Sequence, residues 1–293
     1  MKKKLPLIAI ILIFLIGVGV LSYPLVSSVV NNIATRQEAN ETQKTIKIMP
    51  EAEKTELYAQ ARAYNNSLTD NVILTDPFDE EAYRKIGADY ANAFDVNGRG
   101  LIGYVDIPKL DVYLPVYHGT SEDVLSKYAG HLEMTSIPIG GESTHAVISA
   151  HSAFPGETFF DYLTDMKEGD EFYIHVLDKT LKYVVDQVNV VLPQETNLLK
   201  ITKGEDHVTL VTCTPYSINT HRLLVRGTRV EYDDAEYIDI VPPVVRPQDN
   251  NLYLLGYKIP FWAVGIAIGV VVLAAILIPL VLVRRSRRRR DES

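Results

Sequence analysis

The hydrophobic and polar positions divide the chain into two unbroken apolar runs near its ends and a patterned region between them. The first run covers residues 5–21 and directly follows three lysines. The second run covers residues 261–283 and has 23 residues without a charge. At ~1.5 Å per residue, a helix of that length crosses a hydrocarbon core of ~30 Å. The pattern therefore predicts a membrane helix over residues 261–283.

The charges beside these runs predict an orientation and leave two interpretations of the first run. The second run is followed by RRSRRRR, and basic clusters of this kind stay in the cytoplasm. Basic residues before a short apolar stretch are typical of a secretory signal peptide as well as of an anchor. No clean small-x-small cleavage site follows Leu21, which favours an uncleaved anchor. Either interpretation places the region from about residue 23 to residue 260 outside the cell membrane.

Helical patterns follow the first run. Residues 31–48 are polar and predict a stalk. The stretch MPEAEKTELYAQARAYNN predicts a helix with Pro50 in its first turn and two asparagines at its end. In residues 76–94, four large apolar side chains recur at helical spacing, which predicts a second helix. These side chains are Phe78, Tyr83, Ile86 and Tyr90.

From residue 98 the pattern changes to short β-rich runs. LIGYVDIPKLDVYLPVYHG holds two runs broken at Pro108, HAVISAH alternates, and EFYIHVLDKTLKYVVDQVNVVLP predicts a hairpin that turns near Asp178. HVTLVTC and HRLLVRGTRVEY complete the set, and short helices are expected within 121–128 and 158–166. Seven or eight strands, mostly connected by hairpins, predict a mainly β fold that closes or nearly closes into a barrel.

Charge and composition exclude some functions. The whole chain carries −8, and removing the +3 of the N-terminal lysines and the +4 of residues 284–293 leaves −15 for the exterior part. Nucleic-acid phosphates require lysine and arginine, so we expect no nucleic-acid partner. The sequence contains no C-x-x-C or H-E-x-x-H and no compelling acidic cluster. We therefore expect neither a metal nor another cofactor.

The single cysteine, Cys213, ends the β-rich run HVTLVTC. It is either a small buried apolar residue or a nucleophile, and a nucleophile needs a histidine and a group that stabilises an oxyanion. His151 ends an alternating run and enters a loop that can face a cleft, whereas His145 lies at the other end of that run. Arg222 and Arg226 share one face of the following strand, and spacing alone does not choose between them.

TLVTC, followed nine residues later by the arginine of TPYSINTHRLLVRG, resembles the sortases, the membrane-bound cysteine transpeptidases of Gram-positive bacteria. GHLEMTSIPIGGESTHAVISAHSAFPGETFF resembles the segment that carries their catalytic histidine. The likeness covers about residues 98–230. It implies the catalytic residues His151, Cys213 and Arg222 and an eight-stranded barrel. Many relatives have glycines beside the histidine, where this chain reads AHSA.

The resemblance implies acyl transfer at this site. The Cys213 thiolate attacks the Thr–Gly carbonyl of an LPxTG-like sorting signal, and His151 protonates the leaving amine. Arg222 stabilises the oxyanion or positions the substrate backbone, and an incoming amine resolves the thioester.

Two membrane segments, a long N-terminal extension and the motif TDPFD resemble class C, the pilin polymerases, in which the amine is a lysine of the next pilin subunit. That class implies a regulatory lid made by Asp76 and Phe78, although Pro77 also fits the first turn of a helix.

Three alternatives stay open at this point. A housekeeping sortase would attach proteins to peptidoglycan, a cysteine protease would hydrolyse its substrate, and a non-catalytic surface receptor would tolerate loss of Cys213. The expected partners are pilin subunits with LPxTG-like signals and membrane lipid. The expected location is the cell membrane of a Gram-positive bacterium, with the catalytic domain outside.

The predicted layout has six parts. They are a membrane anchor or signal segment (1–22), a stalk with helices and lid (23–97), the catalytic barrel (98–235), a linker (236–260), a transmembrane helix (261–283) and a cytoplasmic basic tail (284–293).

Overall fold

The computed structural model divides the chain into two compact units, residues 30–246 and residues 1–29 with 247–293. The residues that it describes are 15, 17, 19, 37, 39, 41–68, 74–79, 81–83, 86–152, 159–232, 251–254, 257–260, 267, 269, 271 and 274. In this described part, no helix is both long and apolar enough to cross a membrane. Apart from single positions, the predicted membrane segments 1–22 and 261–283 lie outside the described residues.

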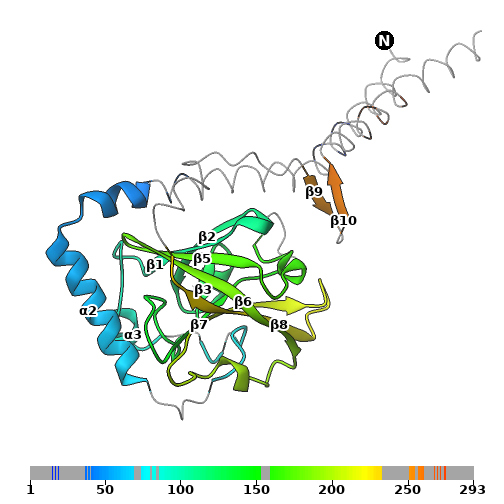
Figure 1. Cartoon of the computed structure of the whole chain (residues 1–293). Coiled ribbons are helices and arrows are strands. Elements are labelled where there is room, and N and C mark those ends of the chain that lie inside the picture. The colour runs from blue at the N-terminus through cyan, green and yellow to red at the C-terminus, as the bar shows by residue number, and fades with distance from the viewer. Residues whose placement is uncertain are drawn as a thin grey trace, which may run out of the picture. The chain divides into compact units, whose positions relative to one another are not determined.

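Eight strands of the larger unit form a closed barrel in the order β1-β2-β3-β4-β7-β8-β6-β5, which confirms the predicted mainly β fold (Figure 1). The barrel closes where β1 pairs with β5. The strands are β1 (Leu101–Ile107), β2 (Val112–His118), β3 (Ala129–His131), β4 (Thr144–Ser149), β5 (Glu171–Val176), β6 (Lys179–Val191), β7 (Asp206–Thr214) and β8 (His221–Val230).

Two neighbouring strand pairs determine where the ends of the central strands meet. β4 runs parallel to β7, so both strands end at the same rim of the barrel. β8 runs antiparallel to β7 and begins at that rim. Residues at the ends of β4 and β7 and at the start of β8 are therefore brought together, although they are far apart in the sequence.

The barrel interior is filled by buried aliphatic and aromatic side chains from all eight strands. Phe172 and Tyr183 stack with ring centroids 5.5 Å apart. They lie over Gly227, where an added Cβ would be 2.6 Å from the Phe172 ring. The close packing of these rings thus requires a residue without a side chain at this point of β8.

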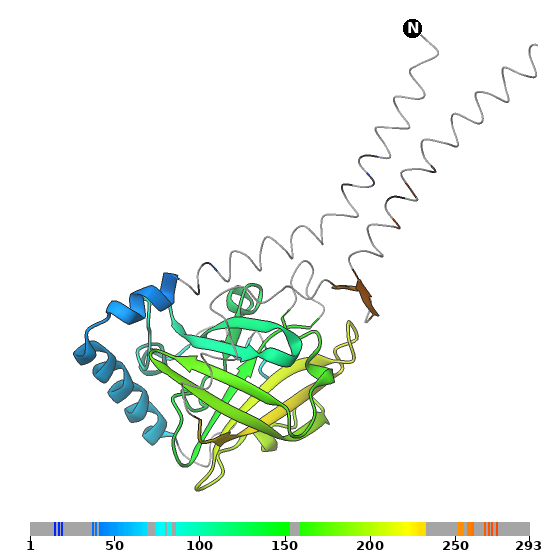
Figure 2. The same cartoon turned by 45° about the horizontal axis from the view of Figure 1, so that its top comes forward.

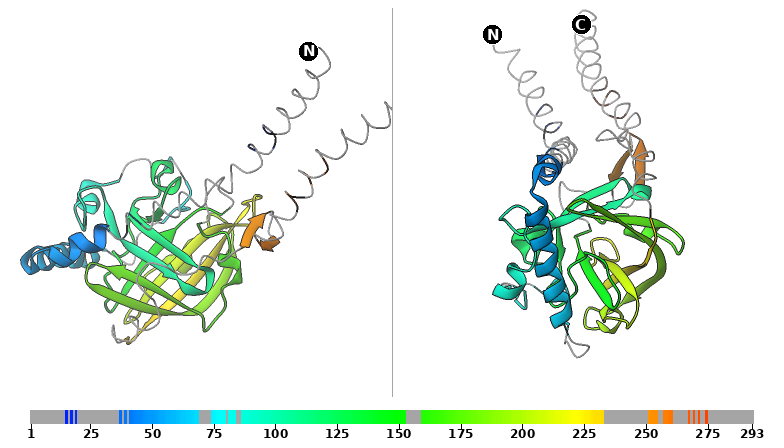
Figure 3. Two further views of the ribbon diagram at one scale, coloured as in Figure 1. Left: turned by 90° about the horizontal axis from the view of Figure 1, so that it is seen from above. Right: turned by 60° about the vertical axis from the view of Figure 1, so that its left-hand side comes forward.

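Helix α2 (Glu51–Ser67) runs along the outside of the barrel (Figures 2 and 3). Pro50 is its N-cap, in agreement with the predicted start. The Tyr58 hydroxyl donates to the carbonyl of Val176 over 3.0 Å, and Asn65 exchanges two hydrogen bonds with the backbone of Ile137. These contacts attach an otherwise polar helix to the barrel.

Several further helical elements, which follow α2 in the chain, are short. They are α3 (Ala88–Ala91), α4 (Glu122–Leu125) and three 3-10 turns, η1 (Pro108–Leu110), η2 (Leu163–Asp165) and η3 (Asn197–Leu199). The expected helices within 121–128 and 158–166 correspond to α4 and to the single turn η2.

The predicted helix over residues 76–94 is wrong. In its described part, only Ala88–Ala91 are helical, and residues 77–78 and 81–83 form turns. The apolar side chains whose spacing suggested one helix pack in two separate clusters. Tyr83 packs in a small cluster with Leu132 and Val147, whereas Tyr90 is buried in the main core.

Two further segments differ from the expected layout. Residues 41–48, at the end of the predicted stalk, are helical, and Ile46 is buried. In the smaller unit, β9 (Asn251–Leu254) and β10 (Tyr257–Pro260) form an antiparallel hairpin within the region predicted as a linker.

Candidate active site

Cys213 and Arg222 are directly opposite each other on neighbouring strands. The antiparallel register of β7 and β8 pairs Cys213 with Arg222. Both residues are buried, with 7% and 9% of their surface exposed. The register results from the nine-residue spacing, which allows a six-residue turn from 215 to 220 between the two strands. A thiol and a guanidinium are therefore held at the same rim of the barrel.

His151 follows β4 by two residues and reaches the level of Cys213. The parallel register pairs Ser149 with Val211, and extending it by two residues brings His151 beside Cys213. Three hydrogen bonds hold this extension. The Ala150 amide donates to the Val211 carbonyl over 3.1 Å, the Thr212 hydroxyl to the Ala150 carbonyl over 2.8 Å, and the Ser152 hydroxyl to the Cys213 carbonyl over 2.8 Å.

Asp76 binds Arg222 from the N-terminal extension. Arg222 Nε and Nη2 donate to the two carboxylate oxygens of Asp76 over 2.8 and 2.6 Å. Arg222 Nη1 donates to the backbone carbonyls of Asn219 and His221, each over 3.0 Å. All three nitrogens of the guanidinium are thus engaged, and Asp76 of the implied lid contacts the arginine of the site.

The Phe78 ring lies against both His151 and Arg222. Its ring centroid is 5.5 Å from that of His151, and the Arg222 guanidinium carbon is 5.1 Å from the Phe78 centroid. The turn around Pro77 is held by the Phe78 amide, which donates to the Asp76 carboxylate, and by the Asp79 amide, which donates to the Asp76 carbonyl. The lid, defined here as residues 75–79, therefore contacts the histidine and the arginine together.

The electrostatic surroundings keep the thiol protonated in this arrangement. Burial raises the pKa of Cys213 to about 11, the Arg222 guanidinium opposes the rise, and the Asp76 carboxylate adds to it. Because the thiolate is the nucleophilic form, burial and the Asp76 carboxylate both disfavour the reactive form of Cys213 in this arrangement.

The other histidines have structural surroundings. His145 bonds to the Lys200 carbonyl and the Thr209 hydroxyl, and burial lowers its pKa to about 4. His207 lies beside His145, at the far end of β7 from Cys213. His131 and His118 lie beside Tyr90, His175 is 3.6 Å from Asp106, and His221 bonds to Thr220.

Arg226 forms an ion pair with Asp186 instead of taking part in the site. Its guanidinium binds both carboxylate oxygens of Asp186, over 2.6 and 3.2 Å. The structure therefore distinguishes the two arginines that spacing left open, since only Arg222 of this pair is opposite Cys213.

Two residues of the site were not predicted from the sequence. Glu122 in α4 has a carboxylate oxygen 3.5 Å from His151 Nε2, and no motif indicated it. Ser152 bonds to the Cys213 carbonyl. One indication of Ser152 was present in the sequence, because it stands where relatives usually have a glycine beside the histidine. That difference did not indicate that its hydroxyl bonds to the Cys213 carbonyl.

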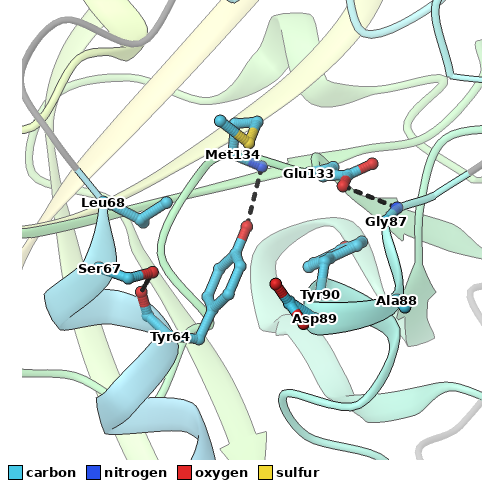
Figure 4. A pocket seen from close by; sticks show the side chains of 9 residues that line it. All are labelled: Tyr64, Ser67, Leu68, Gly87, Ala88, Asp89, Tyr90, Glu133 and Met134. Carbon is cyan, nitrogen blue, oxygen red and sulfur yellow. Dashed lines mark hydrogen bonds between the residues drawn. The ribbon is translucent and has the colours of Figure 1, made fainter.

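A separate pocket of about 340 Å³ lies between the end of α2 and α3 (Figure 4). Tyr64 and Tyr90 form its aromatic walls, and the carboxylate of Glu133 accepts a hydrogen bond from the Gly87 amide. None of the site residues described above lines it. Within the described part of the chain, no group of three histidine, cysteine or acidic side chains is arranged to hold a metal ion.

Comparison with known proteins identifies the family. A family model described as the sortase domain matches residues 105–230. The crystal structure of sortase C-1 from Streptococcus pneumoniae is 48% identical and covers 67% of this chain and 100% of its own, with a TM-score of 0.63. The chain belongs to the sortase family. A pilus-related sortase C of Group B Streptococcus is 44% identical and covers 67% of this chain and 97% of its own, with a TM-score of 0.60.

Both structures are sortases of class C, and this chain therefore resembles class C sortases. Among curated relatives, sortase A of Streptococcus agalactiae is 28% identical over 130 residues, which are 43% of this chain and 52% of that protein. Sortase A of Bacillus anthracis is 27% identical over 143 residues, which are 66% of its length. The chain thus matches about half to two thirds of the length of these relatives.

Proposed function

We propose that this protein is a pilin-polymerising class C sortase, a cysteine transpeptidase. It cleaves an LPxTG-like sorting signal between Thr and Gly and joins the Thr carbonyl to a lysine amine of another pilin subunit. The observation that carries the proposal is the convergence of Cys213, His151 and Arg222 at one barrel rim. The likeness to pilus-related sortases of class C supports the pilin substrate.

The proposed reaction has two acyl transfers. The Cys213 thiolate attacks the Thr carbonyl, and the donors of Arg222 stabilise the oxyanion that forms. The intermediate collapses to a thioester as the Thr–Gly bond breaks, and the His151 imidazolium gives its proton to the leaving Gly amine. The neutral lysine amine then attacks the thioester, His151 takes a proton from it, and the Cys213 thiolate leaves.

The lid regulates this chemistry in the proposal. Asp76 occupies the two guanidinium nitrogens that an oxyanion would use. Phe78 lies against the ring of His151. The lid must therefore move before substrate binds, and its movement leaves the positive charge of Arg222 without Asp76. That unpaired charge favours the thiolate, because Arg222 lowers and Asp76 raises the pKa of Cys213.

The proposed location is the cell membrane of a Gram-positive bacterium. Residues 1–22 anchor the chain or form its signal segment, residues 261–283 cross the membrane, and residues 284–293 form the cytoplasmic tail. The catalytic barrel, residues 98–235, faces the outside. The unbroken apolar runs and the terminal arginines support this layout.

The test is polymerisation by the full chain. The protein is incubated with pilins that carry LPxTG-like signals, and covalent products are separated on denaturing gels. We expect a ladder of multimers, which Cys213→Ala abolishes and His151→Ala nearly abolishes. His221→Ala is the matched control and keeps most of the activity, because His221 bonds to its neighbour Thr220.

The products also distinguish the alternatives. Attachment to peptidoglycan precursors without multimers would indicate a housekeeping sortase. Free carboxylate as the sole product would indicate a hydrolytic cysteine protease. Full function in pilus assembly without Cys213 would refute the catalytic proposal.

A further inference from the structure

Glu122 places a carboxylate beside His151 from a part of the chain outside the motifs. It belongs to α4, the short helix between β2 and β3. Leu125 of the same helix is buried, with 2% of its surface exposed, and contacts the region of Gly130 on β3. This contact fixes α4, and it leaves the Glu122 side chain half exposed with Oε2 3.5 Å from His151 Nε2.

The titratable and charged groups around the site come from five segments of the chain. Cys213 lies on β7, Arg222 on β8 and Asp76 on the lid, and Asp76 is bound to Arg222. Glu122 approaches from α4. Asp161, which follows the loop that carries His151, interacts with Tyr216 in the turn after Cys213. While the lid is closed, the charges of Asp76 and Arg222 compensate each other.

Opening of the lid changes this balance. Once Asp76 leaves, the positive charge of Arg222 is no longer compensated, and a nearby positive charge disfavours a protonated imidazole. The proposed reaction needs the imidazolium at this moment, because His151 must protonate the leaving amine. The Glu122 carboxylate, with Oε2 3.5 Å from Nε2, places a negative charge beside the ring that Arg222 does not neutralise.

We propose that Glu122 is a positioning residue, which holds the His151 ring with Nε2 toward α4 and stabilises its protonated form. This inference rests on the proposed function and adds a residue to it.

The test uses the full chain with Glu122→Gln, Glu122→Asp and Asp123→Asn. Asp123 is the matched control, because it is the next carboxylate on the same helix and is exposed. For each variant, kcat and KM are measured on an LPxTG peptide across pH, and the rate of Cys213 alkylation by iodoacetamide is measured in parallel.

In Glu122→Gln, we expect the alkaline limb of the kcat profile to move down by about half to one pH unit, as expected for one charge at this distance screened by water. At pH 8, kcat falls about three- to tenfold with little change in KM, and alkylation slows by a similar factor. Glu122→Asp recovers part of the shift, and Asp123→Asn keeps the parent profile.

Superimposable kcat and alkylation profiles for Glu122→Gln and the parent would overturn the inference. So would an equal shift in Asp123→Asn, because it would show a general effect of surface charge. Failure of the proposed function looks different, since the parent itself would then not process the peptide. In that case the alkylation profile still decides whether Glu122 acts on the Cys213 and His151 pair.

Discussion

Asp76 and Arg222 are 146 positions apart in the sequence and form a two-pronged ion pair with oxygen to nitrogen distances of 2.6 and 2.8 Å. Their side chains are only 17% and 11% exposed. Charge-assisted hydrogen bonds in such surroundings contribute about 1.5–3 kcal/mol each. We therefore expect the lid to be closed in most molecules and to open when a substrate competes for Arg222.

The first prediction concerns access to the thiol. In Asp76→Ala combined with Phe78→Ala, a bulky thiol reagent should label Cys213 severalfold faster. The pH midpoint of labelling should also fall, because Asp76 no longer raises the pKa of the thiol while Arg222 still lowers it. Labelling is followed by mass spectrometry, and circular dichroism checks that the barrel is folded.

Asp186→Ala is the control for this prediction, since it removes an aspartate from a similar two-pronged pair, with Arg226, away from the site. If the double variant labels no faster than this control, the lid does not gate Cys213.

The second prediction separates the two arginines of β8. Arg222→Ala should lower kcat/KM by ~10²–10³, the effect of removing a preorganised donor to an oxyanion. Arg222→Lys should also be poor, because an ammonium cannot reproduce the planar fork that binds two oxygens. Arg226→Ala should lose far less, because Arg226 binds Asp186 instead. Steady-state kinetics on an LPxTG peptide measure all three variants, and equal losses at the two positions would contradict the assignment.

The barrel could be predicted from the sequence because its determinants are local. Turn residues at Pro108 and Asp178 separate β-rich runs, and the structure has strand ends at both places. Cys213 and Arg222 belong to one hairpin, so the sequence could place an arginine of the following strand near the thiol, but only the register of β7 and β8 selects Arg222 over Arg226. His151 could also be predicted from a local pattern, because it ends an alternating run.

The rest depends on contacts between distant segments. Helical spacing from Phe78 to Tyr90 suggested one helix, but Asp76 binds Arg222 and Tyr90 bonds to His131, and spacing along the chain gives no sign of these two distant partners. Glu122 carries no local signal, because its approach to His151 depends on where α4 is held in the fold.

The third prediction tests how the His151 loop is joined to the nucleophile strand. Ser152→Ala removes the donor to the Cys213 carbonyl and should lower kcat by about three- to tenfold, in line with the ~0.5–1.5 kcal/mol of one hydrogen bond. Ser152→Thr keeps the hydroxyl and should restore most of the rate. Ser67→Ala, which removes a similar bond on the exposed end of α2, serves as the control and should leave kcat unchanged. A Ser152→Ala enzyme with the parent kcat would show that the loop is held by other contacts.

The last prediction concerns acid stability and the fully buried His131. Its Nε2 bonds to the Ser136 carbonyl over 2.7 Å, and the Tyr90 hydroxyl lies 2.8 Å from its Nδ1. Burial lowers its pKa from the ordinary 6.5 to about 3. A base whose pKa is depressed in the folded state takes up its proton more readily when unfolded, so stability falls as the pH drops below 6.5.

At ~1.36 kcal/mol per pH unit for one proton, His131 alone should lower the free energy of unfolding by about 2 kcal/mol between pH 7 and pH 5. Urea titrations of the parent and of His131→Asn at several pH values measure this slope. The variant starts less stable, because it loses buried packing, but its stability should depend less on pH by roughly one proton. The partly exposed His221, replaced by Asn, provides the control and should keep the parent slope. Identical slopes in the parent and His131→Asn would mean that this ring takes up a proton without unfolding.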